Sequence, residues 1–446
     1  MRATQRMIMI STPFIISKWA ITAFATIACS VLPVTLFGQS PSTTSPPSQS
    51  PPEELKLIAT GEHWSQWRGA AGDGHTSGLP SVWKEPEKLW RYELPAQGIG
   101  GVAATEEFVV VSSRDANDQA DLFAMLDAES GVPIWQFSYP SPLQLDYGNS
   151  PRVTPLITDT AVYCLGAQGQ LHCLALETGE VLWKKDLAGD LKGRMPQWGY
   201  AASPKLVNNQ LIVQTGGLEA AWTSLEPDTG KVIWTTVGRA SAYASPILLE
   251  HRGNMQIVSY DAISLGAWSV ENGKRLWEMQ PEVPKDFNVP TPVLVKNKIF
   301  VVTENNGART YSLHPSTSGE FPFELQLESS TDLLSGDSHS PVRVGTYVAG
   351  IDRDLVVLDP DNQLNEVARF SDPALQKYCS LLVDEDRIWI CTANGTQILV
   401  GVQNDSIVEI GRFQSMNESG EIFAHPAICN GVLYLRGPTW IDAYRL

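Results

Sequence analysis

The sequence predicts an all-β fold, an eight-bladed β-propeller of four-stranded antiparallel blades that is closed by an N-terminal strand. Three observations lead to this prediction. A hairpin motif recurs in register along the chain, its tryptophans stand 43 to 51 residues apart, and the repeat region begins and ends with incomplete blades. Alternating apolar residues between Gly-containing turns indicate strands, and a period near 45 residues is typical of a propeller blade.

The first 38 residues are predicted to be a signal peptide. Three bases precede a long apolar stretch that runs to Phe37 without an acid or a base, which is the layout of a secretory signal. Cleavage near Gly38 is favoured over retention as an uncleaved membrane anchor. A lipoprotein site at Cys29 is weaker still, because apolar residues continue after it.

Residues 39–58 are predicted to be a linker, because Ser, Pro, Thr and Gln dominate them and cannot form a core. The remaining residues, 59–446, are expected to form the propeller. Loss of the three bases in the signal peptide changes the formal net charge from −17 to −20. Such an acidic protein is a poor partner for nucleic acid or anionic lipid. We therefore expect an exported monomer, periplasmic or extracellular, that is tethered to a membrane only if the signal peptide stays uncleaved.

The outer hairpin of each blade is the clearest repeat. An apolar strand leads to a turn whose Gly can adopt positive φ, and a second strand that carries Trp follows. Because these tryptophans occupy equivalent positions, we expect them to have a structural role in joining the blades. They are Trp90, Trp135, Trp183, Trp234 and Trp277.

The inner hairpins follow the same order along the chain. Most begin at a Ser-Pro or Thr-Pro pair, and three degenerate copies complete a set of eight; the recognisable starts are Thr154, Ser203, Ser245, Thr291, Ser340, Cys379 and His425. The eighth blade stops after Tyr444 without a fourth strand, whereas Lys88–Glu93 is a strand with no hairpin before it. Pairing these two ends would close the ring and remove exposed sheet edges.

Five of the six cysteines lie beyond the signal peptide, an odd number without dense spacing, so this is not a disulfide-framework protein. Cys164 could face Cys173 across a hairpin, and Cys379 could face Cys391. Buried free thiols are the favoured interpretation of all of them.

The repeats resemble the pyrroloquinoline-quinone-like, or quinoprotein-type, propeller repeat, whose docking motif reads Ala-x-Asp-x-x-Thr-Gly-x-x-x-Trp. The resemblance covers nearly the whole chain from Trp64 to Leu446. More narrowly, the chain is similar to a group of exported bacterial propeller proteins of unsettled function. The segments that carry this narrower resemblance include Gln66–Gly69, Tyr147–Gly148, Arg152–Pro155, Leu171–Leu174, Trp198–Pro204 and Leu433–Arg436.

The resemblance to quinoproteins does not bring a cofactor with it. Quinone-dependent dehydrogenases of this fold place an adjacent cysteine pair over the quinone and hold Ca²⁺ with several oxygen ligands, and this chain has no Cys-Cys pair. Its seven histidines show no metal-binding spacing, and no nucleophile elbow or phosphate loop is present. We therefore expect no catalytic residue, no metal and no cofactor, and the sequence does not favour pyrroloquinoline quinone with Ca²⁺.

A binding site is predicted at one rim of the central channel. The segments that lead into the inner strands should all reach this rim, and aromatic and hydrogen-bonding residues recur in them. The candidates are Tyr147, Arg152, Trp198, Tyr200, Tyr243, Asn288, His339, Tyr378 and His425. For any one of them, packing between blades is the competing interpretation. Trp64, Trp67 and Arg68 begin a Gly-rich stretch that is predicted to form a strap across the ring.

These observations favour a non-catalytic scaffold or binding protein that recognises a protein or small-molecule ligand through the channel rim. The alternative is a divergent quinone-dependent oxidoreductase, or an enzyme that holds a sugar-like ligand at the channel mouth.

Overall fold

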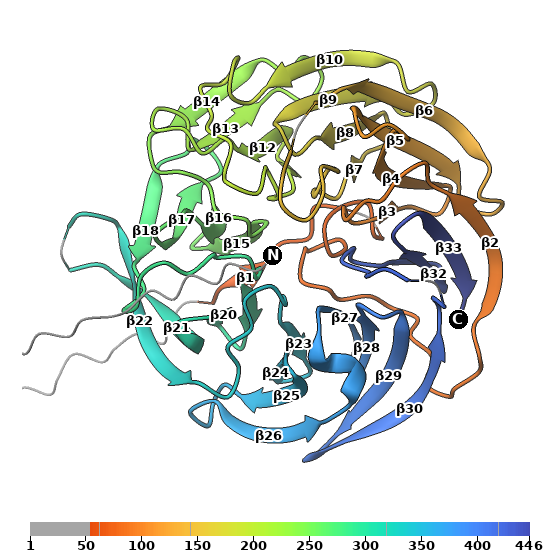
Figure 1. Cartoon of the computed structure of the whole chain (residues 1–446). Coiled ribbons are helices and arrows are strands. Elements are labelled where there is room, and N and C mark those ends of the chain that lie inside the picture. Colours follow the sequence, from red (N-terminus) through yellow and green to blue (C-terminus); the bar gives the residue numbers. More distant parts are fainter. Residues whose placement is uncertain (1–53, 62, 143, 318, 418) are drawn as a thin grey trace, which may run out of the picture. The chain divides into compact units, whose positions relative to one another are not determined.

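The computed structural model describes residues 54–446 except 62, 143, 318 and 418. The predicted signal peptide and most of the predicted linker lie outside the described residues. The strands form eight antiparallel sheets around a central channel (Figure 1). The predicted eight-bladed propeller is confirmed.

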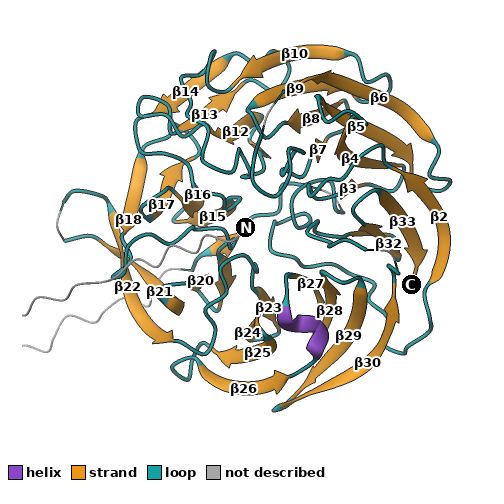
Figure 2. Cartoon of the chain, viewed as in Figure 1, coloured by secondary structure: helices purple, strands orange, loops and turns teal. Residues whose placement is uncertain are grey.

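In every blade the strand nearest the axis is the shortest or equal shortest of the four blade strands (Figure 2). Blades 1 to 4 comprise β3 (Ala103–Ala104), β4 (Phe108–Arg114), β5 (Ala120–Asp127), β6 (Pro133–Pro140); β7 (Leu156–Ile157), β8 (Ala161–Leu165), β9 (Gln170–Ala175), β10 (Val181–Asp186); β11 (Lys205–Val207), β12 (Gln210–Gln214), β13 (Trp222–Leu225), β14 (Val232–Thr236); β15 (Ile247–His251), β16 (Asn254–Tyr260), β17 (Leu265–Ser269) and β18 (Arg275–Met279).

The second half of the ring has the longer outer strands. Blades 5 to 8 comprise β19 (Val293–Val295), β20 (Lys298–Thr303), β21 (Gly307–Pro315), β22 (Phe323–Thr331); β23 (Val342–Val344), β24 (Tyr347–Asp352), β25 (Asp354–Asp359), β26 (Asn365–Phe370); β27 (Cys379–Asp384), β28 (Arg387–Thr392), β29 (Thr396–Gln403), β30 (Ser406–Gln414); β31 (Ala427–Cys429), β32 (Val432–Arg436) and β33 (Trp440–Arg445). Among the described residues the one helical element is the 3₁₀ helix η1 (Pro373–Gln376), and none has the length and hydrophobicity of a membrane span.

The ring closes as predicted. Strand β2 (Glu87–Glu93) pairs with β33 and becomes the outer strand of blade 8, with Trp90 opposite Ala443. Arg91 and Lys88 both contact the fully buried carboxylate of Asp442, at 2.6 Å. Hydrogen bonds and charge pairing therefore join the first and last strands of the propeller.

The repeat tryptophans join neighbouring blades. The indole Nε1 groups of Trp90, Trp135, Trp183 and Trp234 donate to backbone carbonyls in the outer turn of the next blade. The turn glycine of that blade lies under the ring; at Gly179, with φ +70°, an added Cβ would approach the Trp135 ring to 2.7 Å. Each such glycine therefore meets two requirements, positive φ and close approach.

Trp277 is equally structural but has a different partner. It is fully buried, and its Nε1 donates to Gln256 Oε1 within its own blade. The outer turn of blade 5 is longer than the others, and its Gly319 has no atom near enough to meet an added Cβ. The seam between blades 4 and 5 consequently lacks the tryptophan-to-turn bond.

The chain before β2 crosses the channel as predicted. Lys56–Leu57, which the sequence analysis placed in the linker, form β1 and pair with β15 in blade 4. Residues 58–83, here called the strap, then contact Ala104 in blade 1, Thr291 before blade 5, Pro341 before blade 6 and Val383 in blade 7. The strap therefore lies within the channel and reaches from the inner strands of blades 1 and 7 to the segments that precede blades 5 and 6.

The five described cysteines are buried free thiols, as the favoured interpretation had it. The register explains why neither pair is bridged. Cys173 lies opposite Tyr163 rather than Cys164, and Cys391 lies opposite Ser380 rather than Cys379. Because neighbouring residues of a strand point to opposite faces of the sheet, the members of each pair face apart.

Candidate functional site

Six of the nine predicted rim residues line one hollow at the end of the channel where the inner strands begin. We call this hollow the funnel; its volume is about 420 Å³. Tyr147 is 73% exposed there and lies in the same lining as the guanidinium-bearing Arg152. The predicted residues that line the funnel are Tyr147, Arg152, Trp198, Tyr243, Tyr378 and His425.

The segment before blade 2 presents Tyr147 and Arg152 through its own backbone turn. Tyr147 and Gly148 both have positive φ, at +64° and +87°, so the chain reverses there and leaves the Tyr147 ring in solvent. The Arg152 guanidinium fills the inside of the turn by donating to the carbonyls of Asp146, Gly148 and Ser150. Partial burial lowers the pKa of Arg152 to about 10, so this side chain remains a cation at neutral pH.

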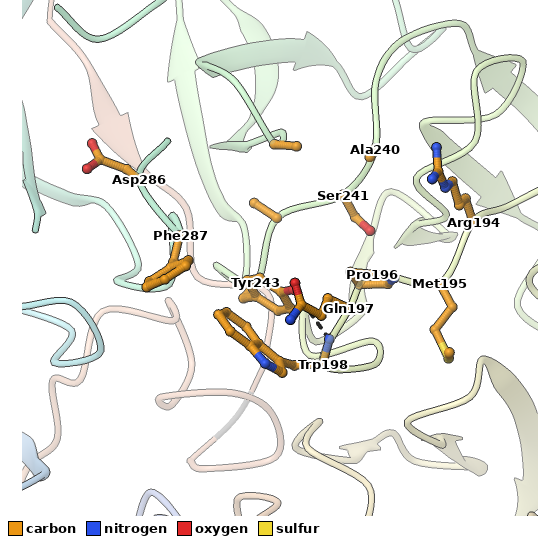
Figure 3. A pocket seen from close by; sticks show the side chains of 12 residues that line it. Arg194, Met195, Pro196, Gln197, Trp198, Ala240, Ser241, Tyr243, Asp286 and Phe287 are labelled. Carbon is orange, nitrogen blue, oxygen red and sulfur yellow. Dashed lines mark hydrogen bonds between the residues drawn. The ribbon is translucent and has the colours of Figure 1, made fainter. Parts of the chain in front are cut away.

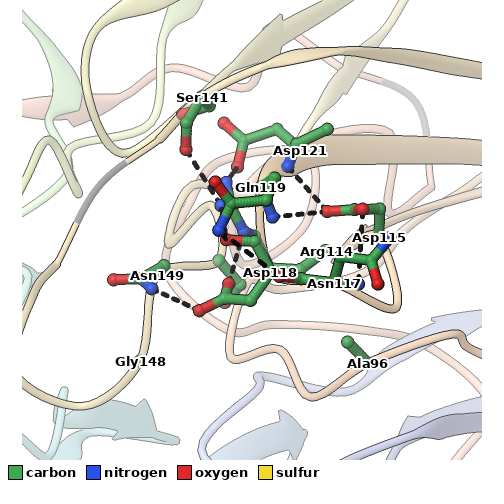
Figure 4. Close-up of polar contacts among 12 residues, drawn as sticks. Ala96, Arg114, Asp115, Asn117, Asp118, Gln119, Asp121, Ser141, Gly148 and Asn149 are labelled. Atoms are coloured by element: carbon green, nitrogen blue, oxygen red, sulfur yellow. Dashed lines mark hydrogen bonds and ion pairs between the residues drawn. The ribbon is translucent and has the colours of Figure 1, made fainter.

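A buried charge network in blade 1 supports this segment from below (Figure 4). Arg114 and Asp121 are almost fully buried and form an ion pair at 2.6 Å, and Arg114 also donates to the backbone of Asp118 and Ser141. The Asn149 amide then donates to the Asp118 carboxylate. The position of the Tyr147 turn is thus tied to a rigid pair inside the blade.

The segments before blades 3, 4 and 5 form one aromatic wall of the funnel. The Trp198 ring lies 5.2 Å from the Tyr243 ring and 4.8 Å from the Phe287 ring, the latter edge-on (Figure 3). The Tyr243 hydroxyl oxygen accepts a hydrogen bond from the Trp198 backbone N–H. Phe287 remains 47% exposed, which leaves an apolar face open at the mouth.

The opposite wall comes from the segments before blades 7 and 8. Tyr378 and Phe423 are 5.8 Å apart between ring centroids, and burial raises the pKa of Tyr378, so its hydroxyl stays protonated. The floor of the funnel lies between these two walls and is formed by Trp67 of the strap and by His425. Their rings pack edge-to-face, with 4.6 Å between the centroids. Burial, and secondarily the nearby Arg68, lowers the pKa of His425 well below its usual value, so this imidazole is neutral at pH 7.

Three predicted rim residues do not line the funnel. Tyr200 is buried, its hydroxyl donates to the Thr215 carbonyl, and its ring covers Gly169. Asn288 is buried in a left-handed turn and joins the segments before blades 4 and 5 by accepting from Ala244 and donating to Asp261. His339 stacks behind Tyr378, at 5.6 Å. Tyr200 and Asn288 are therefore packed between blades, although the Asn288 Oδ1 atom finds no hydrogen-bond partner among the described residues.

Sequence reasoning did not single out three aromatic lining residues, Trp67, Phe287 and Phe423. Phe287 and Phe423 stand one or two positions from predicted residues, in segments that reach the same rim. Their place in these segments could have predicted that they line the funnel. Trp67 was assigned to the strap alone. Its place in the floor depends on how deeply the strap enters the channel, for which the sequence carries no pattern.

The funnel combines aromatic surface with very few charges. Arg152 lies on the side of blade 2 and Asp337 on the side of blade 6, four blades away in the ring. Across the described residues, no cluster of three or more His, Cys, Asp or Glu side chains is arranged to hold a metal ion. A quinone held through Ca²⁺ needs several converging oxygen ligands, and one exposed Asp among aromatic rings does not supply them. The residues present do not fit that cofactor.

Comparison with known proteins places this architecture in a family. Residues 118–371, more than half of the chain, match the family model described as outer membrane protein assembly factor BamB. Outer membrane protein assembly factor BamB of Shewanella oneidensis is 22% identical over 208 residues, covering 42% of this chain and 50% of that protein. Quinoprotein alcohol dehydrogenase PedH of Pseudomonas putida is 27% identical over 177 residues, covering 36% of this chain and 28% of that enzyme. The matches thus span half or less of these relatives.

Among solved structures, BamB from Moraxella catarrhalis superimposes with a TM-score of 0.55 at 15% identity, covering 81% of this chain and 98% of that one. At this identity the likeness concerns the fold alone. The relatives include an enzyme and an assembly factor, so fold and family leave the activity open. The chain belongs to the family described as outer membrane protein assembly factor BamB, and its blades are pyrroloquinoline-quinone-like propeller repeats.

Proposed function

We propose that this protein is an exported, non-catalytic binding protein that acts as a scaffold and holds a partner at the funnel. One observation carries the proposal: aromatic residues from six blade-joining segments converge on a solvent-open hollow beside Arg152, and Tyr147 and Phe287 remain exposed there. Burying apolar surface contributes roughly 25 cal/mol of free energy per Å², which an exposed aromatic ring does not gain. Contact with a partner would bury these rings and supply that free energy.

The family supports a protein partner, since the relative in Shewanella oneidensis is named as an assembly factor. Export is part of the proposal, and the apolar segment that ends at Phe37 supports it. A single propeller of this kind, with its sheet edges closed by β2, needs no second copy to complete the site.

We also propose that this protein functions without a quinone cofactor. The second candidate, a divergent oxidoreductase, has one observation in its favour, the 27% identity to quinoprotein alcohol dehydrogenase PedH. Against it stand the donor set of the funnel and the five cysteines of the described residues, which are buried in strands and absent from the funnel lining. Aromatic rings, one Arg and one exposed Asp suit recognition better than hydride transfer.

Site-specific photo-crosslinking tests the proposal. The full chain carries p-benzoylphenylalanine in place of Tyr147, and a control chain carries it in place of Val408, which is 47% exposed on the outer strand of blade 7. We expect a discrete adduct in cells from position 147 that weakens when Phe287→Ala is added, and none from position 408. Equal adducts from both positions, or none from position 147, would remove the funnel as the binding site.

Reconstitution separates the second candidate. Pyrroloquinoline quinone and Ca²⁺ are added to the purified chain, and alcohol-dependent reduction of a dye is followed. The proposal predicts no turnover and no saturable quinone binding. Saturable binding with turnover that Arg152→Gln abolishes would establish the oxidoreductase instead.

A further inference from the structure

Two smaller hollows adjoin the funnel on two sides. One, of about 310 Å³, lies among the segments before blades 3, 4 and 5 and shares Trp198, Tyr243 and Phe287 with the funnel (Figure 3). The other, of about 330 Å³, lies where blades 8, 1 and 2 meet and shares Tyr147 and Phe423 with it. The first hollow is centred on blade 4 and the second on blade 1, three blades apart in a ring of eight. The three hollows therefore form one bent row across the channel mouth, separated by aromatic side chains and Ile99.

A row of hollows fits an extended chain better than a compact ligand. Successive side chains of an extended peptide alternate in direction, so residues two apart point to the same side and advance by about 7 Å. A small molecule would fill the funnel and leave the two outer hollows empty. Three residues of an extended peptide, each two apart, can place one side chain in each.

The charges indicate which side chains the segment carries. The three hydrogen bonds of the Arg152 guanidinium go to carbonyl oxygens, and no carboxylate among the described residues lies within ion-pair distance of it. Glu421, at the edge of the second outer hollow, is already paired with Lys377 at 2.5 Å. Asp286, beside the first, accepts hydrogen bonds from Asn305 and Asn306. Arg152 in the funnel and the exposed Arg194 at the first outer hollow are thus the two cations of this groove that have no carboxylate partner among the described residues. Of the two, Arg152 is the one that lines the funnel itself.

We propose that the funnel and its two adjoining hollows bind an extended segment of another protein, which inserts an aromatic side chain between the aromatic walls and places a carboxylate against Arg152. The inference rests on the proposed function and narrows its partner to an acidic, aromatic peptide segment. Both Nη2 protons of Arg152 already serve the turn, so a carboxylate would accept from the remaining Nε or Nη1 proton. This charge-assisted contact fixes the register of the segment. The apolar walls contribute the burial.

Blocked peptides test this inference with the full chain. The probe is Ac-Ser-Leu-Ser-Phe-Ser-Glu-Ser-NH2, assayed together with the same residues in reverse order because the direction of the segment is open. The comparison peptides replace Glu by Gln, replace Phe by Ala, or keep only Ac-Ser-Phe-Ser-NH2. Binding is measured by calorimetry to wild type, Arg152→Gln and Arg343→Gln. The last is a matched control, since Arg343 also bonds only a carbonyl, at the far end of blade 6.

For the better of the two directions we expect the peptide Glu→Gln change to weaken binding at least fivefold to wild type and to Arg343→Gln, and less than twofold to Arg152→Gln. Removal of Phe, or truncation to the tripeptide, should weaken binding at least tenfold. Tyr147→Ala, which removes an exposed ring and leaves the Arg152 bonds in place, should also weaken binding, so the test does not depend on Arg152→Gln keeping the turn intact.

Two results would overturn the inference. One is a Glu→Gln penalty that persists unchanged in Arg152→Gln. The other is equal affinity for the tripeptide and the full peptide, which would assign the funnel to a compact ligand. If no peptide binds while the adduct from position 147 still forms, the proposed function stands and this narrower inference is wrong. If neither is seen, both are wrong.

Discussion

Lys205→Met should stabilise this protein, and by an amount that depends on pH. Lys205 begins the inner strand of blade 3, is 1% exposed, and extends its ammonium group over Gly72 of the strap. No described residue accepts a hydrogen bond from it. Burial is the main cause that lowers its pKa to about 7; the charge of Asp73 partly offsets burial, and that of Arg68 adds to it. Asp73 itself is held at 2.8 Å by His75.

The magnitude follows from proton linkage. The folded-state pKa of Lys205 lies below the unfolded value of 10.5, so between pH 7 and pH 10.5 the unfolded chain binds more protons and stability rises with pH. At pH 7 the burial of this group therefore opposes folding by roughly 4 kcal/mol, and at pH 10.5 by almost nothing. Methionine has a similar shape without the charge. For a chain of this size we expect Tm to rise by about 5 °C at pH 7.

Differential scanning calorimetry at pH 7 and pH 10 measures this directly, with Lys274→Met as the control because Lys274 is exposed and its loss changes the net charge equally. The control should show little change at either pH. A Tm for Lys205→Met that falls at pH 7, or that rises equally at both pH values, would refute the placement of an unpaired ammonium group in the channel.

Three further substitutions test the fold and the support of the site. Trp183→Ala should cost about 3 to 5 kcal/mol in a denaturant titration, because it removes a buried ring and its bond to the Pro227 carbonyl; an unchanged midpoint would contradict the blade-docking role. Gly179→Ala should destabilise more than Gly253→Ala, since both have φ near +70° but only at Gly179 does an added Cβ meet a ring; equal midpoints would mean that the close contact with Trp135 is not needed. Asp121→Asn should cost roughly 3 kcal/mol, because it removes the buried partner of Arg114 and leaves only the ion pair with the exposed Asp118, and it should increase amide exchange in residues 145–152; unchanged exchange there would show that the Tyr147 turn is held independently.

The repeat made the architecture predictable from sequence. Tryptophans, turn glycines and Ser-Pro or Thr-Pro pairs recur in register. The number of blades, the strand order and the closing role of β2 could therefore be predicted from the sequence. The hydrogen-bond partner of Trp277 could not be predicted from the sequence, because it depends on the length of the outer turn in blade 5. The strap was recognised as a segment, but its contacts with blades 5 to 7 join residues 224 to 308 positions apart, and no local pattern encodes these contacts.

The site was predictable as a location and less so as a residue list. Periodicity brings the segments before the inner strands to one rim, which is why Tyr147, Trp198, Tyr243 and His425 meet in the funnel. Whether a side chain in such a segment faces the funnel or the neighbouring blade depends on one or two backbone torsions. Asn288 turns inward through a left-handed conformation, and the adjacent Phe287 takes the exposed position.

The central claim is that a partner is held at the funnel, and hydrogen–deuterium exchange on the purified complex tests it most directly. The partner is the protein that the photo-crosslinker at position 147 identifies, and exchange in the full chain is compared with and without it. The account predicts slower exchange in residues 145–152, 196–200, 240–245 and 420–426, with the outer strands β22 and β30 unchanged. Slower exchange confined to outer strands, with the rim segments unaffected, would contradict it.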